Sequence, residues 1–408
     1  MSPTNTFHDQ NAETSTLTNP TLVLNCGSSS IKYALISEDE STRITGLAEN
    51  LGLDTARIKH TTLNNEKLEI PISGGRHKLA LQKILELLEQ YHFVAVGHRV
   101  VHGGREYSEA VRVDEHVLSE VKRLKILAPL HNPAHALGIE AVQAIYPNVP
   151  QVVVFDTAFH QTMPPVAYRY PIPKALFDEH RIRRYGFHGT SHAYVSERAS
   201  DITDTKGTHG WLTAHLGNGC SATAVYDGKS LDTSMGLTPL EGLMMGTRSG
   251  DVDPSLHMHL KRQLDMSLED IDAMLNHESG LMGVSGLSND LRTVEQAANE
   301  GHADAMLAVE MFCYRVGKYL AGLSCALPEF TGIVFTGGIG ENSATTRNRI
   351  LEVMRHFGIK VDAAKNAKLV GGNEGSIHAE DSSIELWVVP TDEECRIAQE
   401  TRAALNLA

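Results

Sequence analysis

Three short apolar runs in this chain each lead into a glycine-rich turn. The runs span residues 21–24, 211–214 and 333–336, and the turns that follow them span 25–32, 215–221 and 337–342. Glycine lets the backbone turn tightly and approach a ligand closely, and successive backbone N–H groups in such turns form concave anion sites. One such turn would be weak evidence, but three in the same context indicate a nucleoside triphosphate held between two halves of the protein.

The rest of the hydrophobic pattern alternates between strand and helix. Apolar runs predict strands at 21–25, 31–37, 43–48, 93–101, 152–155, 212–216, 222–226 and 384–389. Apolar residues three and four apart predict helices at 76–90, 115–128, 133–145, 303–327, 343–356 and 392–405. This alternation is typical of the α/β class. The succession of strand, glycine turn and strand at 21–37 returns at 212–226, which indicates an internal structural duplication.

The length of 408 residues predicts two domains, because it exceeds one ordinary core. Prolines 164, 165, 171 and 173 indicate a crossing between them. We expect residues 1–20, which are polar, to be a disordered extension. Residues 21–160 together with 390–408 are expected to form an N-terminal domain, and residues 161–389 a C-terminal domain for nucleotide binding and dimerisation.

Charge and cysteine content limit the classes of partner and the cellular environment that we expect for this protein. The net charge is −14 and no long basic run occurs, which argues against nucleic acid or an anionic membrane as a partner. The five cysteines form no C-x-x-C pair, so a reduced, cytoplasmic protein is expected. The stretch 303–327 is apolar, but Glu310, Arg315 and Lys318 interrupt it, so we predict a buried helix whose apolar face serves a core or an interface.

Basic residues near the turns are candidates for anion binding. Lys32 follows the first turn, where Asn25 and neighbouring serines favour phosphate contact over a solvated strand lysine. Arg99 lies inside an apolar run and Arg248 in a glycine-rich loop, and a buried arginine requires an anionic partner. Each could form a structural ion pair, whereas two converging on one anion would clamp a transition state. Neither G-x-x-x-x-G-K-[ST] nor G-x-G-x-x-G occurs, which disfavours the P-loop and Rossmann folds.

Three further residues are candidates for chemistry. Asp156 ends a predicted strand, where α/β sheets usually place their sites. Glu393 starts a predicted helix, so it either caps that helix or binds Mg²⁺. His188 and His192 have the spacing of a helical zinc pair, but no third ligand follows. His188 lies between glycines and suits a hydrogen-bond donor better.

Two of these segments, residues 23–32 and 186–192, closely resemble the two signatures of the acetokinase family, and the resemblance extends from Leu22 to about Leu405. It implies the duplicated actin-like ATPase fold, of the ribonuclease H-like type, with a nucleotide cleft between two domains. It also implies reversible phosphoryl transfer from ATP to acetate, giving acetyl phosphate and ADP with Mg²⁺, or Mn²⁺ in its place, in a homodimer.

The resemblance assigns roles to individual residues. The expected metal ligands are Asn25 and Glu393, and the catalytic residues are Arg99, Asp156, His188 and Arg248. The acid, held by Arg99, is expected to place its methyl group among Val101, Leu130, Phe187 and Pro239. The expected ATP-binding residues are Ser28, Ser30, Lys32, His215, Leu216, Gly217, Asn218, Gly219, Asp290, Leu291, Arg292, Gly337, Gly338, Ile339, Gly340 and Glu341. Leu291 departs from the bulkier residue usual at the centre of its triplet.

Two alternatives stay open at this point. The first is a propionate or butyrate kinase of the same family, and the second an actin-like ATPase without acyl chemistry. Arg99 on an apolar strand near Val101 argues against the second, which has no need of that feature. Because a carboxylate substrate is already ionised at neutral pH, Asp156 is better explained as an orienting group than as a proton acceptor.

Overall fold

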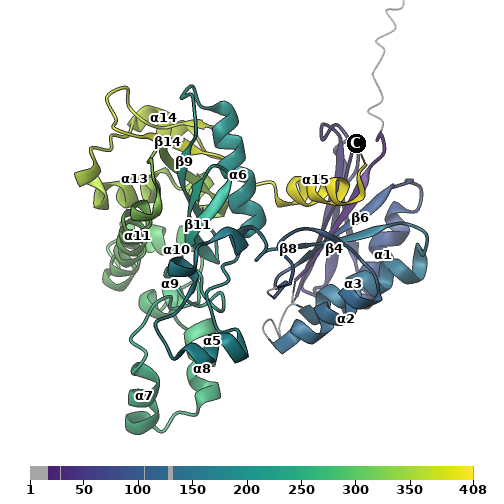
Figure 1. Cartoon of the computed structure of the whole chain (residues 1–408), viewed down its shortest axis with the longest axis horizontal. Coiled ribbons are helices and arrows are strands. Elements are labelled where there is room, and N and C mark those ends of the chain that lie inside the picture. The colour runs from purple at the N-terminus through teal and green to yellow at the C-terminus, as the bar shows by residue number, and fades with distance from the viewer. Residues whose placement is uncertain (1–16, 28, 105, 127–131, 408) are drawn as a thin grey trace, which may run out of the picture.

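Two β-sheets covered by helices form the two halves of the structure (Figure 1). The computed structural model describes residues 17–27, 29–104, 106–126 and 132–407. The first sheet has the order β5-β4-β3-β2-β1-β6-β8-β7, and the second β11-β10-β9-β12-β14-β13. The strands of the first sheet are β1 (Thr21–Cys26), β2 (Ile31–Ile36), β3 (Arg43–Glu49), β4 (Arg57–Thr61), β5 (Lys67–Pro71), β6 (Ala95–Val100), β7 (Val111–Arg112) and β8 (Gln151–Phe155). Those of the second are β9 (Gly210–Leu216), β10 (Cys220–Tyr226), β11 (Lys229–Thr233), β12 (Gly332–Thr336), β13 (Gly375–Ser376) and β14 (Glu385–Val388).

The same five-stranded unit occurs in both sheets. In the first, β1 pairs antiparallel with β2, β2 antiparallel with β3, and β6 and β8 add in parallel beyond β1. In the second, β9, β10 and β11 repeat the antiparallel part, and β12 and β14 add in parallel beyond β9. The duplication predicted from the sequence pattern is therefore confirmed by strand order and direction.

Helices cover both sheets. In the first half they are α1 (His77–Leu88), α2 (Glu115–Arg123) and α3 (Asn132–Ile145). In the second half they are α4 (Pro165–Tyr168), α5 (Lys174–His180), α6 (Gly189–Ile202), α7 (Leu256–Leu264), α8 (Leu268–His277), α9 (Gly280–Ser285), α10 (Leu291–Asn299), α11 (Ala303–Leu323), α12 (Gly337–Asn342), α13 (Ala344–Val353) and α14 (Ala363–Lys368), before α15 (Glu393–Leu405).

The two halves exchange one helix each. The chain leaves the first sheet and forms α6, whose Val195 and Ala199 pack with Trp211 and Val334 of the second sheet. It then leaves the second sheet and forms α15, whose Ile397 packs with strands of the first sheet. Helices α6 and α15 contact each other between the sheets (Figure 1). Each sheet is thus completed by a helix that follows the other.

Several elements differ from the sequence-based prediction. Strands β4 and β5 were not predicted, because their sequences RIKHT and KLEIP carry too few apolar residues and β5 is a mostly exposed edge. The apolar face of α11, including Val309 and Leu320, is buried in the core of the second half.

Residues 1–16 of the predicted extension lie outside the described residues, while the Thr18 N–H already bonds the Ser37 hydroxyl at 3.1 Å. Within the described ranges, no helix is long and apolar enough to cross a membrane.

The closest approach of α15 to the first sheet occurs at Gly97. A Cβ added there would lie 2.3 Å from Thr401 Oγ1 and 2.9 Å from Ile397 Cγ2. We expect Gly97→Ala to lower the free energy of unfolding by about 1–3 kcal/mol, because the helix must shift to admit the methyl group. Gly322→Ala in α11 is the control, since nothing lies within 4 Å of its added methyl group. Denaturant titration checks both variants, and equal stabilities would contradict the close packing.

Candidate active site

The carboxyl ends of β1, β6 and β8 bring three predicted site residues together. The Arg99 guanidinium donates from Nε to Asp156 Oδ1 at 2.8 Å and from Nη2 to Oδ2 at 2.5 Å. It also donates from Nη1 to Asn25 Oδ1 at 3.1 Å. Asp156 is 1% exposed, so the pair is desolvated on the carboxylate side. Three of the five N–H groups of Arg99 are used in this way, and two remain for a ligand.

A second carboxylate, that of Glu393, approaches the same arginine. Glu393 Oε2 lies 3.6 Å from Arg99 Nε. Burial raises the pKa of Asp156, and the charge of Glu393 adds to this, although Arg99 favours the ionised form. Burial would also raise the pKa of Glu393, but Arg99, His215 and Lys32 outweigh it and hold the pKa below its ordinary value. One arginine thus faces two carboxylates, an excess of negative charge that favours a cation.

The start of α15 separates the two roles considered for Glu393. The N-cap is Asp392, whose Oδ1 accepts a hydrogen bond from the Cys395 N–H at 3.0 Å. Glu393 is the first helical residue, and its side chain faces Arg99. Asp392, not Glu393, therefore makes the capping hydrogen bond, while Glu393 lies in the first turn with its carboxylate toward Arg99.

The lysine of the first turn already has a partner. Lys32 lies opposite Asn25 in the β1–β2 register, and its Nζ is 2.8 Å from Glu394 Oε2. The Lys32 side chain is 56% exposed whereas that of Glu394 is 9% exposed, so solvent reaches the lysine and it can turn toward an incoming phosphate. Ser30 is partly buried, and Ser28 lies outside the described residues.

Arg248 contrasts with Arg99, because no carboxylate among the described residues pairs with it. Its Nη1 contacts only the Met245 sulfur, at 3.8 Å, and burial lowers its pKa. A Cβ added at Gly219 would lie 3.5 Å from Arg248 Nη1 and 3.5 Å from His188 Nε2. Glycine therefore leaves a space in the second turn on which a cation and an imidazole nitrogen converge. A guanidinium and an imidazole that converge in this way can both donate hydrogen bonds to one anion.

His188 lies at the N-terminus of α6 in the left-handed region, with φ 57°. Such a backbone conformation in a non-glycine residue is costly and is often found at functional sites. Its ring stacks on His215, with centroids 4.4 Å apart. Burial, then the nearby His215, His192, Arg99 and Arg248, lowers the pKa of His188 well below its ordinary value. The imidazole is therefore neutral at physiological pH.

A cavity of about 800 Å³ opens beside the second and third turns. Predicted ATP-binding residues that line it are Gly217, Asn218, Asp290, Leu291, Arg292, Gly338 and Ile339. Arg292 is 88% exposed at the rim, where Asp290 holds its guanidinium through Nε and Nη2. Leu291 is 3% exposed, so its departure from the usual bulkier residue leaves little side-chain surface to contact a nucleotide.

Other predicted ATP-binding residues lie beneath or beside this cavity. Leu216, Gly337 and Gly340 are buried. The Glu341 carboxylate accepts hydrogen bonds from the Gly337 N–H at 2.9 Å and the Thr391 N–H at 3.1 Å. It joins the third turn to the segment between β14 and α15. In this arrangement Glu341 orders the loops rather than lining the cavity.

The predicted methyl pocket is assembled from both halves. Val101 follows β6 in the first half, Phe187 precedes α6, and both belong to the buried core cluster of the second half. Pro239 lies in the loop after β11 and is partly buried, with no described contact that joins it to Val101. Leu130 lies outside the described residues.

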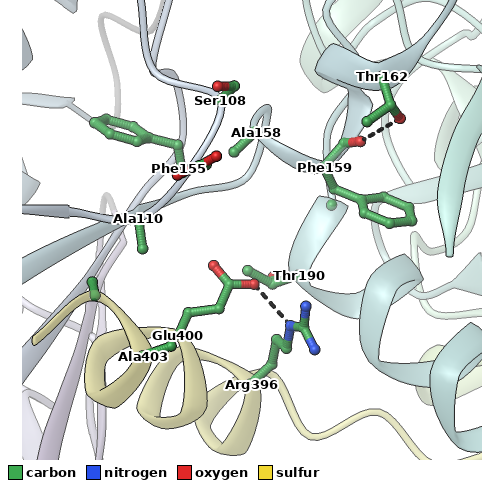
Figure 2. A pocket seen from close by; sticks show the side chains of 13 residues that line it. Ser108, Ala110, Phe155, Ala158, Phe159, Thr162, Thr190, Arg396, Glu400 and Ala403 are labelled. Atoms are coloured by element: carbon green, nitrogen blue, oxygen red, sulfur yellow. Dashed lines mark hydrogen bonds and ion pairs between the residues drawn. The ribbon is translucent and has the colours of Figure 1, made fainter. Parts of the chain in front are cut away.

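A separate cavity of about 430 Å³ lies where the halves meet, between β8, the start of α6 and α15. Figure 2 shows Phe155 and Ala158 on one side of it and the ion-paired Arg396 and Glu400 of α15 on another. None of the predicted site residues lines it. This cavity is therefore separate from the predicted site residues.

Sequence analysis missed several polar residues around the site. Ser191 bonds His215 Nδ1 at 2.8 Å, and Ser221 bonds His188 Nδ1 at 2.9 Å. Glu394, the partner of Lys32, was not singled out either. The available signal was the occurrence of polar residues, Ser221 among them, inside strands that are otherwise apolar. Among the described residues, no cluster of three or more histidines, cysteines or acidic residues could hold a metal.

Comparison with known proteins decides the family. The sequence profile of the acetokinase family matches residues 20–399. The chain belongs to the acetokinase family. The acetate kinase of Ectopseudomonas mendocina is 54% identical over 390 residues, 94% of this chain and 98% of that protein. The acetate kinase of Deinococcus radiodurans is 51% identical over 387 residues, 93% of this chain and 97% of that protein.

Two crystal structures are similar along almost the whole chain. A propionate kinase from Francisella tularensis matches with a TM-score of 0.89 and 46% identity, covering 94% of this chain and 99% of that one. The acetate kinase of Porphyromonas gingivalis matches with a TM-score of 0.88 and 43% identity, covering 95% and 100%.

Family membership confirms the resemblance found in the sequence and the duplicated actin-like ATPase fold. The protein is a kinase that uses ATP or ADP together with a divalent metal ion.

Proposed function

We propose that this chain is an acetate kinase, which transfers the γ-phosphoryl group of ATP to acetate and, in reverse, that of acetyl phosphate to ADP. The observation that carries this proposal is the space at Gly219, on which Arg248 and His188 converge. The nucleotide cavity lies beside the same turn through Gly217 and Asn218. The acid is ionised at neutral pH, so one of its oxygens forms the new bond to phosphorus as the bond to the ADP oxygen breaks.

Catalysis on this view consists of positioning and charge neutralisation, because no proton has to be removed from the nucleophile. Arg99, aligned by Asp156 and Asn25, offers its two remaining N–H groups to the acid and the transferring group. Arg248 and His188 bind the phosphoryl oxygens at the Gly219 space. Asp156 acts through Arg99, since both of its oxygens already accept from the guanidinium.

The remaining predicted contacts complete the nucleotide site. We assign the phosphates to Ser28, Ser30, Lys32 and the backbone from His215 to Gly219, and the adenosine to residues 290–292 and to the third turn from Gly337 to Glu341. The cavity lining supports the adenosine assignment for Asp290, Leu291, Arg292, Gly338 and Ile339. The position of Glu341 supports only an indirect role.

The metal is assigned as Mg²⁺, or Mn²⁺ in its place. Asn25 Oδ1 and the Glu393 carboxylate would supply oxygen ligands, and the lowered pKa of Glu393 keeps that carboxylate ionised for a cation. Mg²⁺ is commonly held by one or two side chains together with waters and substrate phosphates. When bound, the ion neutralises charge on the phosphates.

The pocket around Val101 and Phe187 supports acetate over longer acids. Both side chains are buried, at 7% and 2% exposed, and the two γ-methyl groups of Val101 would occupy the volume that an additional methylene of the acid needs. The similarity to a propionate kinase shows that family membership alone does not fix chain length. Propionate or butyrate therefore stays the alternative substrate.

The organisation of the protein follows from its packing, its cysteines and one exposed helix face. We assign residues 21–160 with 390–408 to one domain, as the packing of α15 suggests, and residues 161–389 to the other. All five cysteines are free, which suits a reducing cytoplasm. The solvent face of α11 carries Met306, Leu307 and Tyr314, 48–56% exposed, and supports a homodimer.

Removing either arginine tests the anion site. We expect Arg99→Ala and Arg248→Ala each to lower kcat by about 10²- to 10³-fold, because a donor to developing charge is lost. Acetyl phosphate formation, trapped as the hydroxamate, gives the rate. Arg262→Ala on the exposed face of α7 is the control and should keep full activity. Near-normal turnover in either site variant would contradict the assignment.

Neighbouring acidic residues at the start of α15 separate metal binding from helix capping. Glu393→Gln should raise the Mg²⁺ concentration needed for half-maximal rate several-fold, because a charged ligand is lost. Asp392→Ala should leave that concentration unchanged and lower stability by about 1 kcal/mol through loss of the cap. Magnesium titrations of the rate and thermal unfolding measure both effects. An unchanged magnesium requirement in Glu393→Gln would remove it from the metal site.

Val101 tests the substrate assignment. Val101→Ala should raise kcat/KM for propionate relative to acetate by about 10-fold or more, since one methylene is worth roughly 1–3 kcal/mol in such a pocket. Val100→Ala is the matched control, because Val100 is buried in a different cluster of the first half. It should lose stability without changing the ratio. An unchanged ratio in Val101→Ala would mean that another residue sets chain length.

The dimer is tested by sedimentation. We expect a two-fold dimer at micromolar concentration, and we expect Tyr314→Lys on the exposed face of α11 to weaken it. Tyr226→Lys, partly buried at the end of β10, is a control away from that face. A monomeric wild-type protein would overturn the proposal.

A further inference from the structure

A chain of four side chains leads from the candidate phosphoryl site into the core of the second half. His188 Nδ1 is 2.9 Å from Ser221 Oγ, Ser221 Oγ is 2.7 Å from His192 Nε2, and His192 Nδ1 is 2.7 Å from Thr213 Oγ1. Ser221, His192 and Thr213 are each 0% exposed. We call Thr213, His192 and Ser221 the histidine relay, because they reach the site only through His188.

The number of hydrogens on the hydroxyl and ring nitrogens allows two hydrogen-bonding patterns in the relay. Ser221 has one hydroxyl hydrogen and lies between two ring nitrogens, so one ring must donate to it and the other must accept from it. Burial lowers the pKa of both His188 and His192 well below the ordinary value, so each neutral ring carries one N–H. The two arrangements therefore run in opposite directions along the whole relay.

Thr213 decides between the two directions. Its hydroxyl can donate either to His192 Nδ1, at 2.7 Å, or to the carbonyl oxygen of Thr223, at 3.4 Å. The second distance is beyond the usual range for an O–H donor, whereas the first is near its optimum. Donation to His192 Nδ1 places the hydrogen of His192 on Nε2, which then donates to Ser221. The Ser221 hydroxyl consequently donates to His188 Nδ1.

We propose that the histidine relay fixes His188 in the tautomer that carries its hydrogen on Nε2, so that a neutral imidazole donates a hydrogen bond to the transferring phosphoryl group. The inference rests on the proposed function, and it makes Thr213, His192 and Ser221 positioning residues. His188 Nε2 is the nitrogen that faces the Gly219 space beside Arg248. In the opposite tautomer a bare lone pair would face the phosphoryl oxygens and repel them.

The relay explains how His188 can act as a donor without being protonated. After burial, the largest influences on the pKa of His188 come from His215, His192, Arg99 and Arg248, and all of them oppose an imidazolium ion. A donor that depended on protonation would be mostly absent at neutral pH. A tautomer fixed by the hydrogen bond from Ser221 to His188 Nδ1 supplies the same hydrogen bond at any pH above the pKa of His188. Loss of the correct tautomer at a catalytic histidine is known to be costly.

The test uses the full-length protein and two substitutions that break the relay. Ser221→Ala removes its central hydroxyl, and Thr213→Val removes the hydroxyl that sets its direction. Thr223→Val is the matched control. Thr223 pairs with Thr213 in the β9–β10 register and is equally buried, but its hydroxyl bonds Thr233 at 2.8 Å and not a histidine.

Two measurements are made on each protein. Proton–nitrogen correlation spectra of histidine-labelled protein, assigned with His188→Gln, report which ring nitrogen of His188 carries the hydrogen. Steady-state kinetics over pH 6–9 report kcat and KM. We expect wild type and Thr223→Val to show a protonated Nε2 and a kcat that does not rise toward low pH. We expect Ser221→Ala and Thr213→Val to lose about 10- to 100-fold in kcat with little change in the KM for ATP, and to regain rate as pH falls.

The outcomes separate the relay from the proposed function. A wild-type His188 with its hydrogen on Nδ1 would overturn the relay, whatever the activity. Rates for Ser221→Ala and Thr213→Val equal to that of Thr223→Val would also overturn it. A wild-type protein that makes no acetyl phosphate yet shows the Nε2 tautomer would overturn the proposed function and leave the tautomer assignment standing.

Discussion

One face of each sheet is covered by a helix that follows the other sheet in the chain. Helix α6 packs on the second sheet and α15 on the first. The exchange of α6 and α15 therefore constrains everything between the sheets. It fixes where both helices begin, and those N-termini carry His188 and Glu393. The Gly189 N–H bonds the Asp156 carbonyl at 3.0 Å, and a Cβ on Gly189 would lie 2.1 Å from that oxygen. The first turn of α6 is thereby attached to the end of β8, and His188 is held next to the segment that carries Asp156.

The two arginines of the candidate site show how burial distributes charge. Arg99 is compensated before any ligand binds, because Asp156 and Asn25 occupy three of its N–H groups. Arg248 has no such compensation among the described residues, and burial lowers its pKa. A compensated arginine is held in place and serves alignment, whereas an uncompensated one gains most from an arriving anion. The pairing around Arg99 also leaves Glu393 as a second carboxylate beside the same guanidinium, 3.6 Å from its Nε.

The buried histidines also depend on polar partners, but as neutral groups and not as charges. His188, His192 and His215 all have lowered pKa values, so they are polar residues in a core and not charges. Each has at least one ring nitrogen bonded to a hydroxyl group, provided by Ser191, Ser221 or Thr213, and His192 has both bonded in this way. The cost of burying polar side chains is offset when every donor has an acceptor, and the same satisfied network holds the rings in one orientation.

The sequence by itself determined the α/β class, the duplication, the three glycine turns and the family, because these depend on short-range periodicity and on local motifs. It also singled out Arg99, since a charged residue inside an apolar run can be recognised from the sequence alone. It did not find β4 and β5, whose stability comes from strand pairing and not from apolar content.

Only the tertiary structure decided which partners these residues take. Lys32 pairs with Glu394, 362 positions away, and Val101 meets Phe187 in a core built by the other half. Asp392 caps α15 and releases Glu393, a distinction that two adjacent acidic residues cannot reveal in sequence. The direction of hydrogen bonds behind His188 depends on distances between α6, β9 and β10. These pairings form because residues far apart in the sequence are buried against one another in the folded protein. The local sequence around each residue does not specify which distant residue that will be.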